Sequence, residues 1–187
     1  MYSDGPEKNM KYFKRKDIID YLYQNYTKAD GLWFLKVEEL YGFDKALEID
    51  VSVWKVIPKL QARFIKKILL EAFQKDGIAD NRTDENQTAK TLLFEALKIK
   101  LSLDRFEYKV SKNKAAISLR IDRCPWHEIM LKAQRDAFSE KIGSAICNNE
   151  YSAFIAEFYP DAVINISSRL CNGNDCCNFK FSIKIPD

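Results

Sequence analysis

The chain has 187 residues, 47% hydrophobic and 30% charged, a balance typical of a globular protein that buries its own core. The formal net charge of +3 is too small and too dispersed to indicate nucleic-acid binding, so no nucleic acid is expected as a partner. No stretch reaches the roughly 18 uninterrupted apolar residues of a membrane span, and the charged N-terminus does not resemble a signal peptide. We therefore expect a cytoplasmic protein without membrane contact.

Through residues 1–100 the apolar side chains recur three and four positions apart, which predicts a helical N-terminal part. Ala29-Asp30-Gly31 interrupts the first pattern, so a break between two helices is expected there. Gly42 is placed to end the second helix. The large aromatic residues of this part either line a pocket for a planar ligand or, as is commoner at helical spacing, belong to the core: Trp33, Phe34, Tyr41, Trp54 and Phe64.

Asp44 is suited to cap a third helix, in which Pro58 predicts a kink or a break near Ile57. Residues 76–87 are polar and lack an apolar stripe, which indicates a linker. A further helix is expected over residues 88–100, where the apolar side chains again follow helical spacing.

Apolar and polar residues begin to alternate after Asp104, which predicts a β-hairpin with one buried face. Two helices, over about 126–138 and 143–158, follow the hairpin. A second pair of alternating segments ends the chain, with the turn-forming sequence CNGNDC between them. The apolar strand positions include Tyr108, Val110, Ile117, Leu119, Ile121, Ala162, Ile164, Ile166, Leu170, Phe179, Phe181 and Ile183.

The fold expected from this order is α+β, with N-terminal helices packed on a four-stranded antiparallel sheet of two hairpins and two further helices between the hairpins. We expect residues 1–100 to form the helical part and residues 101–187 the sheet, its helices and the cysteines. At this length the two parts fit one domain spanning residues 1–187.

The five cysteines lie between residues 124 and 177, in a chain for which no export signal is expected, which favours free thiols, a metal site or catalysis over a disulfide framework. Strand alternation places Cys177 on the apolar face and Cys176 on the polar face. Cys147 shares a helix face with aromatic residues that must pack on the sheet. Cys124 ends a strand, and Cys171 lies across a turn from Cys177. We therefore expect four cysteines to meet where one helix reaches the end of the sheet: Cys124, Cys147, Cys171 and Cys177.

Three interpretations of these four cysteines remain open. Free cysteine often serves as a small buried hydrophobe without a chemical role. Three or four converging thiolates bind zinc, although the spacing here is not the paired CxxC…CxxC pattern. A nucleophilic Cys147 needs a base, and His127 is the one histidine of the chain. Glu150 is placed to position a water or a basic group of a ligand.

Several segments resemble known families. GLWFLKVEELYGFDKALEIDVSVWKVIPKLQARFIKK is similar to the N-terminal signature of a family of uncharacterised archaeal and bacterial proteins. The segments IDRCPW, AICNNEYSAFIAEFYP and SSRLCNGNDCCNFKF resemble the L-2-amino-thiazoline-4-carboxylic acid hydrolase family. This chain has Glu150 at a position where that family usually has an aspartate. The matching motif positions are Cys124, Cys147 with Glu150, Gly173, and Cys177 with Phe179.

The C-terminal segments are also similar to the four-vinyl-reductase small-molecule-binding domain, whose members include sensors of aromatic compounds with a zinc site beside the ligand pocket. This resemblance implies that Cys147, Cys171 and Cys177 bind the metal, with Cys124 or His127 as a fourth ligand. It also implies a homodimer. The leading hypothesis is therefore a small-molecule-binding domain with a cysteine-lined zinc site.

Two other functions are kept beside this hypothesis. The first is a hydrolase of a small cyclic C–N bond, with Cys147 as the catalytic thiol and His127 and Glu150 assisting. The second is an interaction protein in which the cysteines are purely structural.

Overall fold

The computed structural model describes residues 12–75 and 85–183, with side chains from residue 88 onward in the second range. The chain divides into two compact units, residues 1–48 and residues 49–187, and each is described by itself. Within the described ranges, no helix combines the length and the apolar character needed to cross a membrane.

The first unit consists mainly of one long helix, α1 (Arg15–Tyr41), with the start of α2. The break expected at residues 29–31 is wrong, because α1 runs through it. A single glycine inside a helix costs only about 1 kcal/mol relative to alanine, which the rest of the helix offsets. Gly42 does end α1, with a φ of 82° that favours glycine, as the sequence predicts.

Helices α2 (Phe43–Val53) and α3 (Ile57–Lys75) are separated by a turn, so the break predicted by Pro58 is confirmed. Pro58 lies in the first turn of α3, where its missing N–H group has no helical partner to lose. Helix α4 (Glu85–Leu103) covers the helix expected at 88–100. Most of the predicted linker lies outside the described residues.

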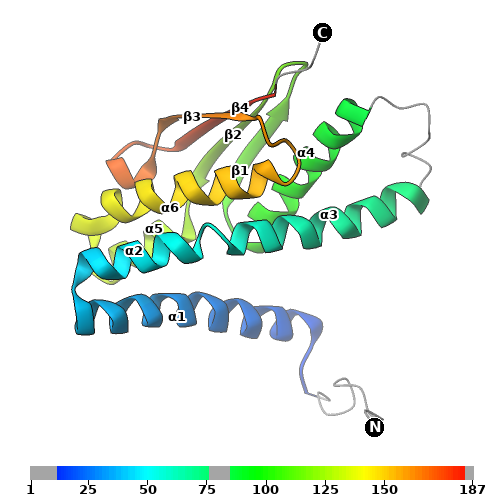
Figure 1. The fold of residues 1–187 in the computed structure, drawn as a ribbon. Helices are drawn as coiled ribbons and strands as arrows, with labels where there is room; N and C mark the ends of the chain where they lie inside the picture. The colour runs from blue at the N-terminus through cyan, green and yellow to red at the C-terminus, as the bar shows by residue number, and fades with distance from the viewer. Residues whose placement is uncertain (1–11, 76–84, 184–187) are drawn as a thin grey trace. The chain divides into compact units, whose positions relative to one another are not determined.

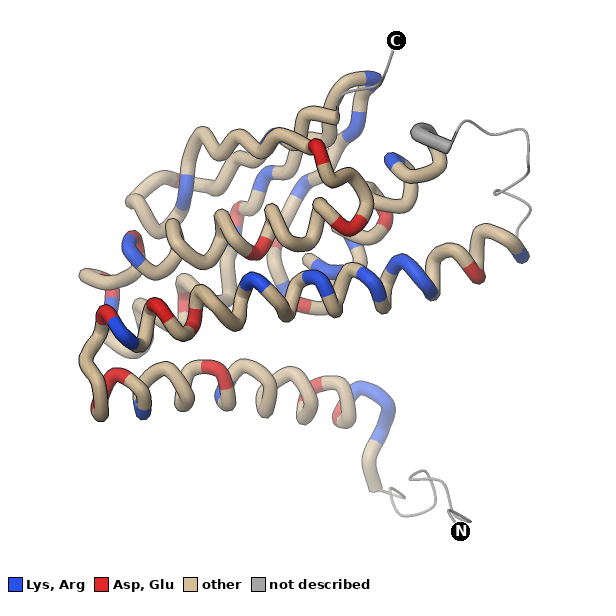
Figure 2. The backbone as a smooth tube through the Cα atoms, in the orientation of Figure 1, with Lys and Arg blue, Asp and Glu red and all other residues tan. Residues whose placement is uncertain are grey.

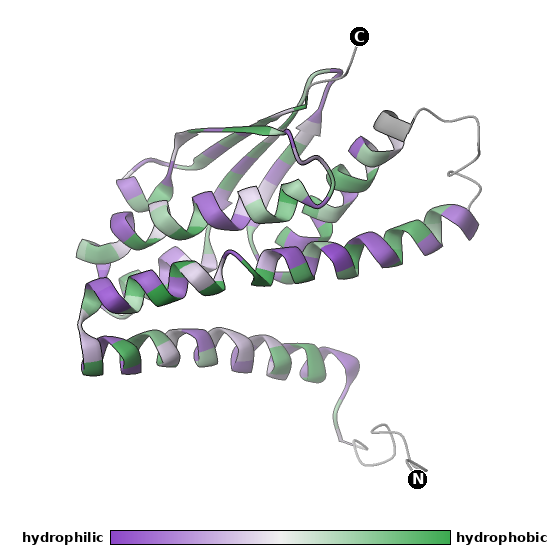
Figure 3. Cartoon of the chain, in the orientation of Figure 1, coloured by the Kyte–Doolittle hydropathy of each residue, from purple (hydrophilic) through white to green (hydrophobic). Residues whose placement is uncertain are grey.

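The sheet contains β1 (Glu107–Lys112), β2 (Ala116–Arg123), β3 (Val163–Ser168) and β4 (Cys177–Ser182). The strand order is β1-β2-β4-β3 and every neighbouring pair is antiparallel, which confirms the α+β fold with two hairpins (Figure 1). Figure 3 shows hydrophobic and hydrophilic residues alternating along these strands, as expected for a sheet with one buried face.

The two helices between the hairpins differ from the predicted ranges. Helix α5 (Pro125–Lys132) is shorter than expected, because Gln134 takes a left-handed φ of 55° that ends it. Helix α6 (Asp136–Ala156) therefore begins well before the predicted start at residue 143. After β3, residues Leu170–Asn172 form a short 3-10 helix, η2, so Leu170 is not part of the strand.

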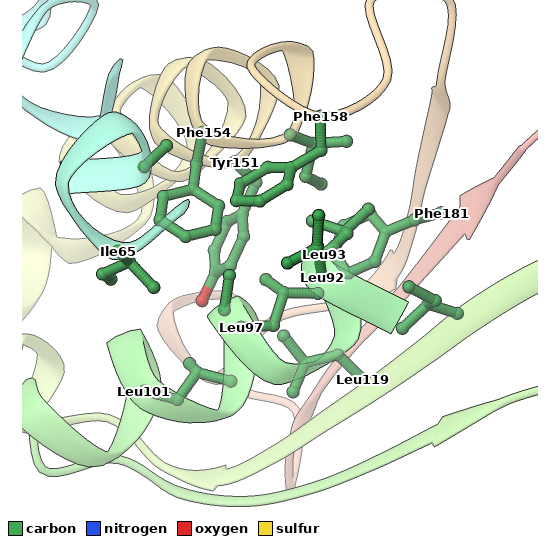
Figure 4. Packing of buried hydrophobic residues seen from close by; sticks show 14 of the residues in the cluster. Ile65, Leu92, Leu93, Leu97, Leu101, Leu119, Tyr151, Phe154, Phe158 and Phe181 are labelled. Atoms are coloured by element: carbon green, nitrogen blue, oxygen red, sulfur yellow. The ribbon is translucent and has the colours of Figure 1, made fainter. Parts of the chain in front are cut away.

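The core of the second unit lies between the sheet and the helices α3, α4 and α6 (Figure 4). Their apolar faces meet the inward side chains of β2 and β4, and truncating such a buried leucine or phenylalanine typically costs about 2–5 kcal/mol. The largest fully buried side chains of this core include Leu93, Leu97, Leu101, Ile117, Leu119, Tyr151, Phe154, Ile155 and Phe181.

Candidate functional site

Three charged side chains form an ion cluster in the buried interior between α4 and α6. The Nζ atom of Lys100 lies 2.6 Å from Asp104 Oδ2 and 2.6 Å from Glu150 Oε1. The Lys100 side chain is only 2% exposed and that of Glu150 6%, whereas that of Asp104 is 14% exposed. Buried charges are tolerated when they are paired, so the three groups depend on one another.

Sequence reasoning selected Glu150 but missed its partner Lys100. A signal was present in helix spacing, because Lys100 lies seven residues after Leu93 and therefore on the apolar face of α4. Burial alone lowers the pKa of Lys100, but the carboxylates of Glu150 and Asp104 outweigh that effect and the net pKa is raised. Lys100 is therefore a cation that holds the two carboxylates and is not a neutral amine.

Tyr151 follows Glu150 on α6 and is only 1% exposed; its ring is tilted against that of Phe179 and stacked with that of Phe181. Its hydroxyl oxygen is buried and has no hydrogen-bond partner among the residues that the structure describes. In Figure 4 this hydroxyl is directed away from α6, towards α4. Burial, followed by the negative charge of Glu150, raises the pKa of Tyr151 well above its usual value, so the phenol stays protonated.

The four predicted cysteines gather at this end of the sheet. Cys147 lies one turn before Tyr151 on α6. Its pKa is raised first by burial and then by the negative charge of Glu150, with smaller contributions from Cys124, Cys171 and Cys177 when these thiols ionise. This mutual influence places the four sulfurs within electrostatic range of one another. The expectation that Cys177 points inward is met, because it belongs to the hydrophobic core.

Close packing of η2 on α6 fixes Cys171 and Cys177. A Cβ atom at Gly143 of α6 would lie 2.8 Å from Cys171 Sγ, so the absence of a side chain there allows the approach. The backbone N–H of Leu170 donates to Cys177 Sγ at 3.2 Å. Cys176 lies just before β4 and is only 6% exposed, so the expectation that it points outward is wrong. The side-chain amide of Asn178 donates to its Sγ at 3.2 Å.

The thiols approach one another without forming a metal centre. Across residues 12–75 and 85–183, no group of three or more His, Cys, Asp and Glu side chains is arranged to hold a metal ion. A tetrahedral zinc site requires its ligands about 2.0–2.3 Å from one point. The thiols in their present positions do not fit zinc, and the zinc site stays a prediction that elemental analysis has to test.

Of the three residues predicted as catalytic, two are paired with other side chains and the third is a protonated thiol. His127 Nδ1 lies 2.9 Å from the hydroxyl of Ser139, which joins α5 to the start of α6. Glu150 is paired with Lys100, and burial keeps Cys147 protonated. No hydrogen bond among the described residues joins Cys147, His127 and Glu150, so this part of the chain contains no preassembled nucleophile and base.

Cys124 immediately precedes α5. Burial raises its pKa to about 12, while the backbone N–H groups of Trp126 and His127 at the start of α5 act in the opposite direction. A thiol with so high a pKa is a poor nucleophile at neutral pH. At this pH the thiols contribute apolar, polarisable surface rather than negative charge.

A protein-family model described as "Family of unknown function (DUF6125)" matches residues 10–182. The chain therefore belongs to this family. No curated protein and no solved structure matches it. The resemblances to the thiazoline hydrolase family and to the four-vinyl-reductase domain stay predictions.

Proposed function

We propose that the chain is a cytoplasmic small-molecule-binding domain whose ligand contacts Tyr151 where α6 meets the cysteine end of the sheet. The observation that carries the proposal is the buried Tyr151 hydroxyl without a partner among the described residues. A buried unsatisfied polar group costs about 1–3 kcal/mol, so proteins rarely keep one without a use. A ligand that accepts a hydrogen bond from this hydroxyl removes the cost.

The surroundings of Tyr151 define the class of ligand. Protonated thiols and core side chains offer mainly apolar contact, as the partly buried Cys147 and the buried Phe154 illustrate. With both carboxylates ionised, Lys100, Asp104 and Glu150 carry a net charge of −1, which repels an anion in a low-dielectric interior. We infer a compact, largely apolar molecule, neutral or cationic, with one hydrogen-bond acceptor.

Thermal denaturation with a panel of neutral aromatic and heterocyclic compounds, beside their carboxylate analogues, tests the proposal. A neutral compound at one hundred times its Kd is expected to stabilise the protein by about 2.7 kcal/mol, which raises the Tm by about 5–11 °C. Tyr151→Phe is expected to lower its affinity by about tenfold, the loss of one hydrogen bond. Absence of any shift, or an equal shift in Tyr151→Phe, contradicts the proposal.

A second function, an interaction protein, is favoured by the surface of α1. None of the residues of this helix is buried, and large apolar side chains stand out from it. Trp33 is 72% exposed and Tyr41 68%, so the expectation that the aromatic residues belong to the core is wrong for these two, whereas Trp54 is buried as expected. Contiguous exposed apolar surface of this kind marks interaction sites.

The spacing on α1 favours a second copy of the chain as the partner. Ile19, Leu22, Trp33 and Leu40 are 51–72% exposed and fall on one stripe of alternating three- and four-residue steps, the pattern of a coiled-coil seam. At 1.5 Å per residue the seam is about 32 Å long. A helix pair of that length buries an area of the order of the ~800 Å² per partner that stable dimers use.

Sedimentation or light scattering of the full chain tests this second function. The wild type is expected to be a dimer at micromolar concentration, and Leu22→Glu with Trp33→Glu is expected to give a folded monomer. Leu131→Glu places the same charge on an exposed leucine of α5 and serves as the matched control, which should stay dimeric. A monomeric wild type, or an unchanged dimer in the α1 variant, rules out this interface.

A further inference from the structure

The open face of the sheet carries a groove distinct from the buried cluster. The helices cover one face only, and the opposite face of β1, β2 and β4 is lined by exposed polar side chains. The groove has a volume of about 320 Å³, at the lower end of the roughly 300–1,000 Å³ of small-molecule sites. Its polar lining comprises Lys109, Ser111, Ser118, Arg120, Asn178 and Lys180, with Ser167 beside β4.

Strand register concentrates positive charge in this groove. Lys109 is the direct cross-strand partner of Arg120, and Lys180 is the direct cross-strand partner of Ser118. Figure 2 shows several basic positions along the strands of the sheet. Like charges placed directly opposite each other destabilise a sheet. The side chains of Lys109 and Lys180 have no ion-pair or hydrogen-bond partner among the described residues, and no acidic side chain lines the groove.

Two acidic side chains near the groove, Asp122 and Asp175, act on Arg120. Arg120 Nε donates to Asp122 Oδ1 at 2.6 Å, and Asp175 also raises the pKa of Arg120, after the larger effect of Asp122. The two ammonium groups are therefore left uncompensated, beside serine hydroxyls that donate hydrogen bonds. This donor set matches a group with several anionic oxygen atoms.

We propose that this groove binds the phosphate group of a small phosphorylated molecule. Lys109 and Lys180 supply the charge, and the hydroxyls of Ser111 and Ser118 donate to the phosphate oxygens. The volume leaves room for a small organic group beyond the phosphate. The site is separate from Tyr151, which lies on the helix-covered side, so it adds a second ligand class to the proposed function.

Calorimetric titration of the full chain with inorganic phosphate and with glycerol phosphate tests the inference. Lys109→Gln with Lys180→Gln is expected to weaken binding at least tenfold. Lys67→Gln with Lys132→Gln removes the same charge from exposed helix positions and should change the affinity less than twofold. Tighter binding of the ester identifies a phosphorylated molecule as the ligand, and equal binding identifies free phosphate.

A second readout does not require a ligand. Because Lys109 faces Arg120 across the strands, Lys109→Gln in phosphate-free buffer is expected to raise the Tm by about 1–2 °C. No binding of either phosphate compound at millimolar concentration overturns the inference, and so does equal weakening in the two double variants.

Discussion

Replacing Lys100 with methionine tests whether the ion cluster is a mutually dependent unit. The substitution keeps the length of the side chain but leaves Glu150, 6% exposed, and Asp104 without their shared cation. Removing one partner of a buried ion pair typically costs about 3–5 kcal/mol. At about 2–4 °C for each kcal/mol in a chain of this size, the Tm is expected to fall by about 6–20 °C.

The same experiment has two matched comparisons. Lys98→Met removes a lysine of the same helix whose Nζ lies 2.8 Å from Glu95 but whose side chain is 42% exposed, and it should cost less than about 1 kcal/mol. Adding Glu150→Gln to Lys100→Met removes the stranded carboxylate and should recover at least half of the loss. Urea denaturation provides the free energies of unfolding. Equal stability of the Lys100 and Lys98 variants would refute the reasoning.

Three further predictions concern neighbouring residues. Tyr151→Phe removes a hydroxyl without a partner among the described residues, so the ligand-free variant should be as stable as the wild type or up to about 1 kcal/mol more stable. A clear loss of unfolding free energy in chemical denaturation would show that the hydroxyl does have a hydrogen-bond partner. Gly143→Ala should destabilise by about 1–3 kcal/mol because its Cβ meets Cys171 Sγ at 2.8 Å and Cys171 Cβ at 3.1 Å. In a Cys171→Gly background, which removes both atoms, the same change should cost much less, as urea unfolding will show. Burial raises the pKa values of Cys124 and Cys147, so both thiols should resist Ellman's reagent at pH 8, and fast reaction of both would contradict this. The free energy of unfolding should also fall as the pH rises above about 9, because the thiols ionise first in the unfolded chain.

The sequence predicted those parts of the site that depend on the period of a single element. The two-residue repeat of β4 places Cys177 inward, and the face of α6 that carries Cys147 must also carry the aromatic core residues. The pairing of Lys100 with Glu150 was missed because it joins two helices far apart in the chain. A lysine near a helix end is usually solvated, so its position on the apolar face was not recognised.

The errors in the fold have local causes. The break predicted inside α1 relied on Gly31, which a long helix tolerates. The start of α6 was placed too late because Arg135, at its N-terminus, makes no side-chain capping hydrogen bond and gives no sequence signal. Gln134 ends α5 in a left-handed conformation that glycine or asparagine would have indicated.

The state of the Tyr151 hydroxyl during ligand binding tests the account most directly. Carbon-13 NMR of protein labelled at tyrosine Cζ, with Tyr151→Phe to assign the resonance, reports on hydrogen bonding at this one oxygen. A neutral ligand that stabilises the protein should move the Tyr151 signal by more than any other tyrosine signal. An unmoved Tyr151 signal at saturating ligand would place the binding site elsewhere in the molecule.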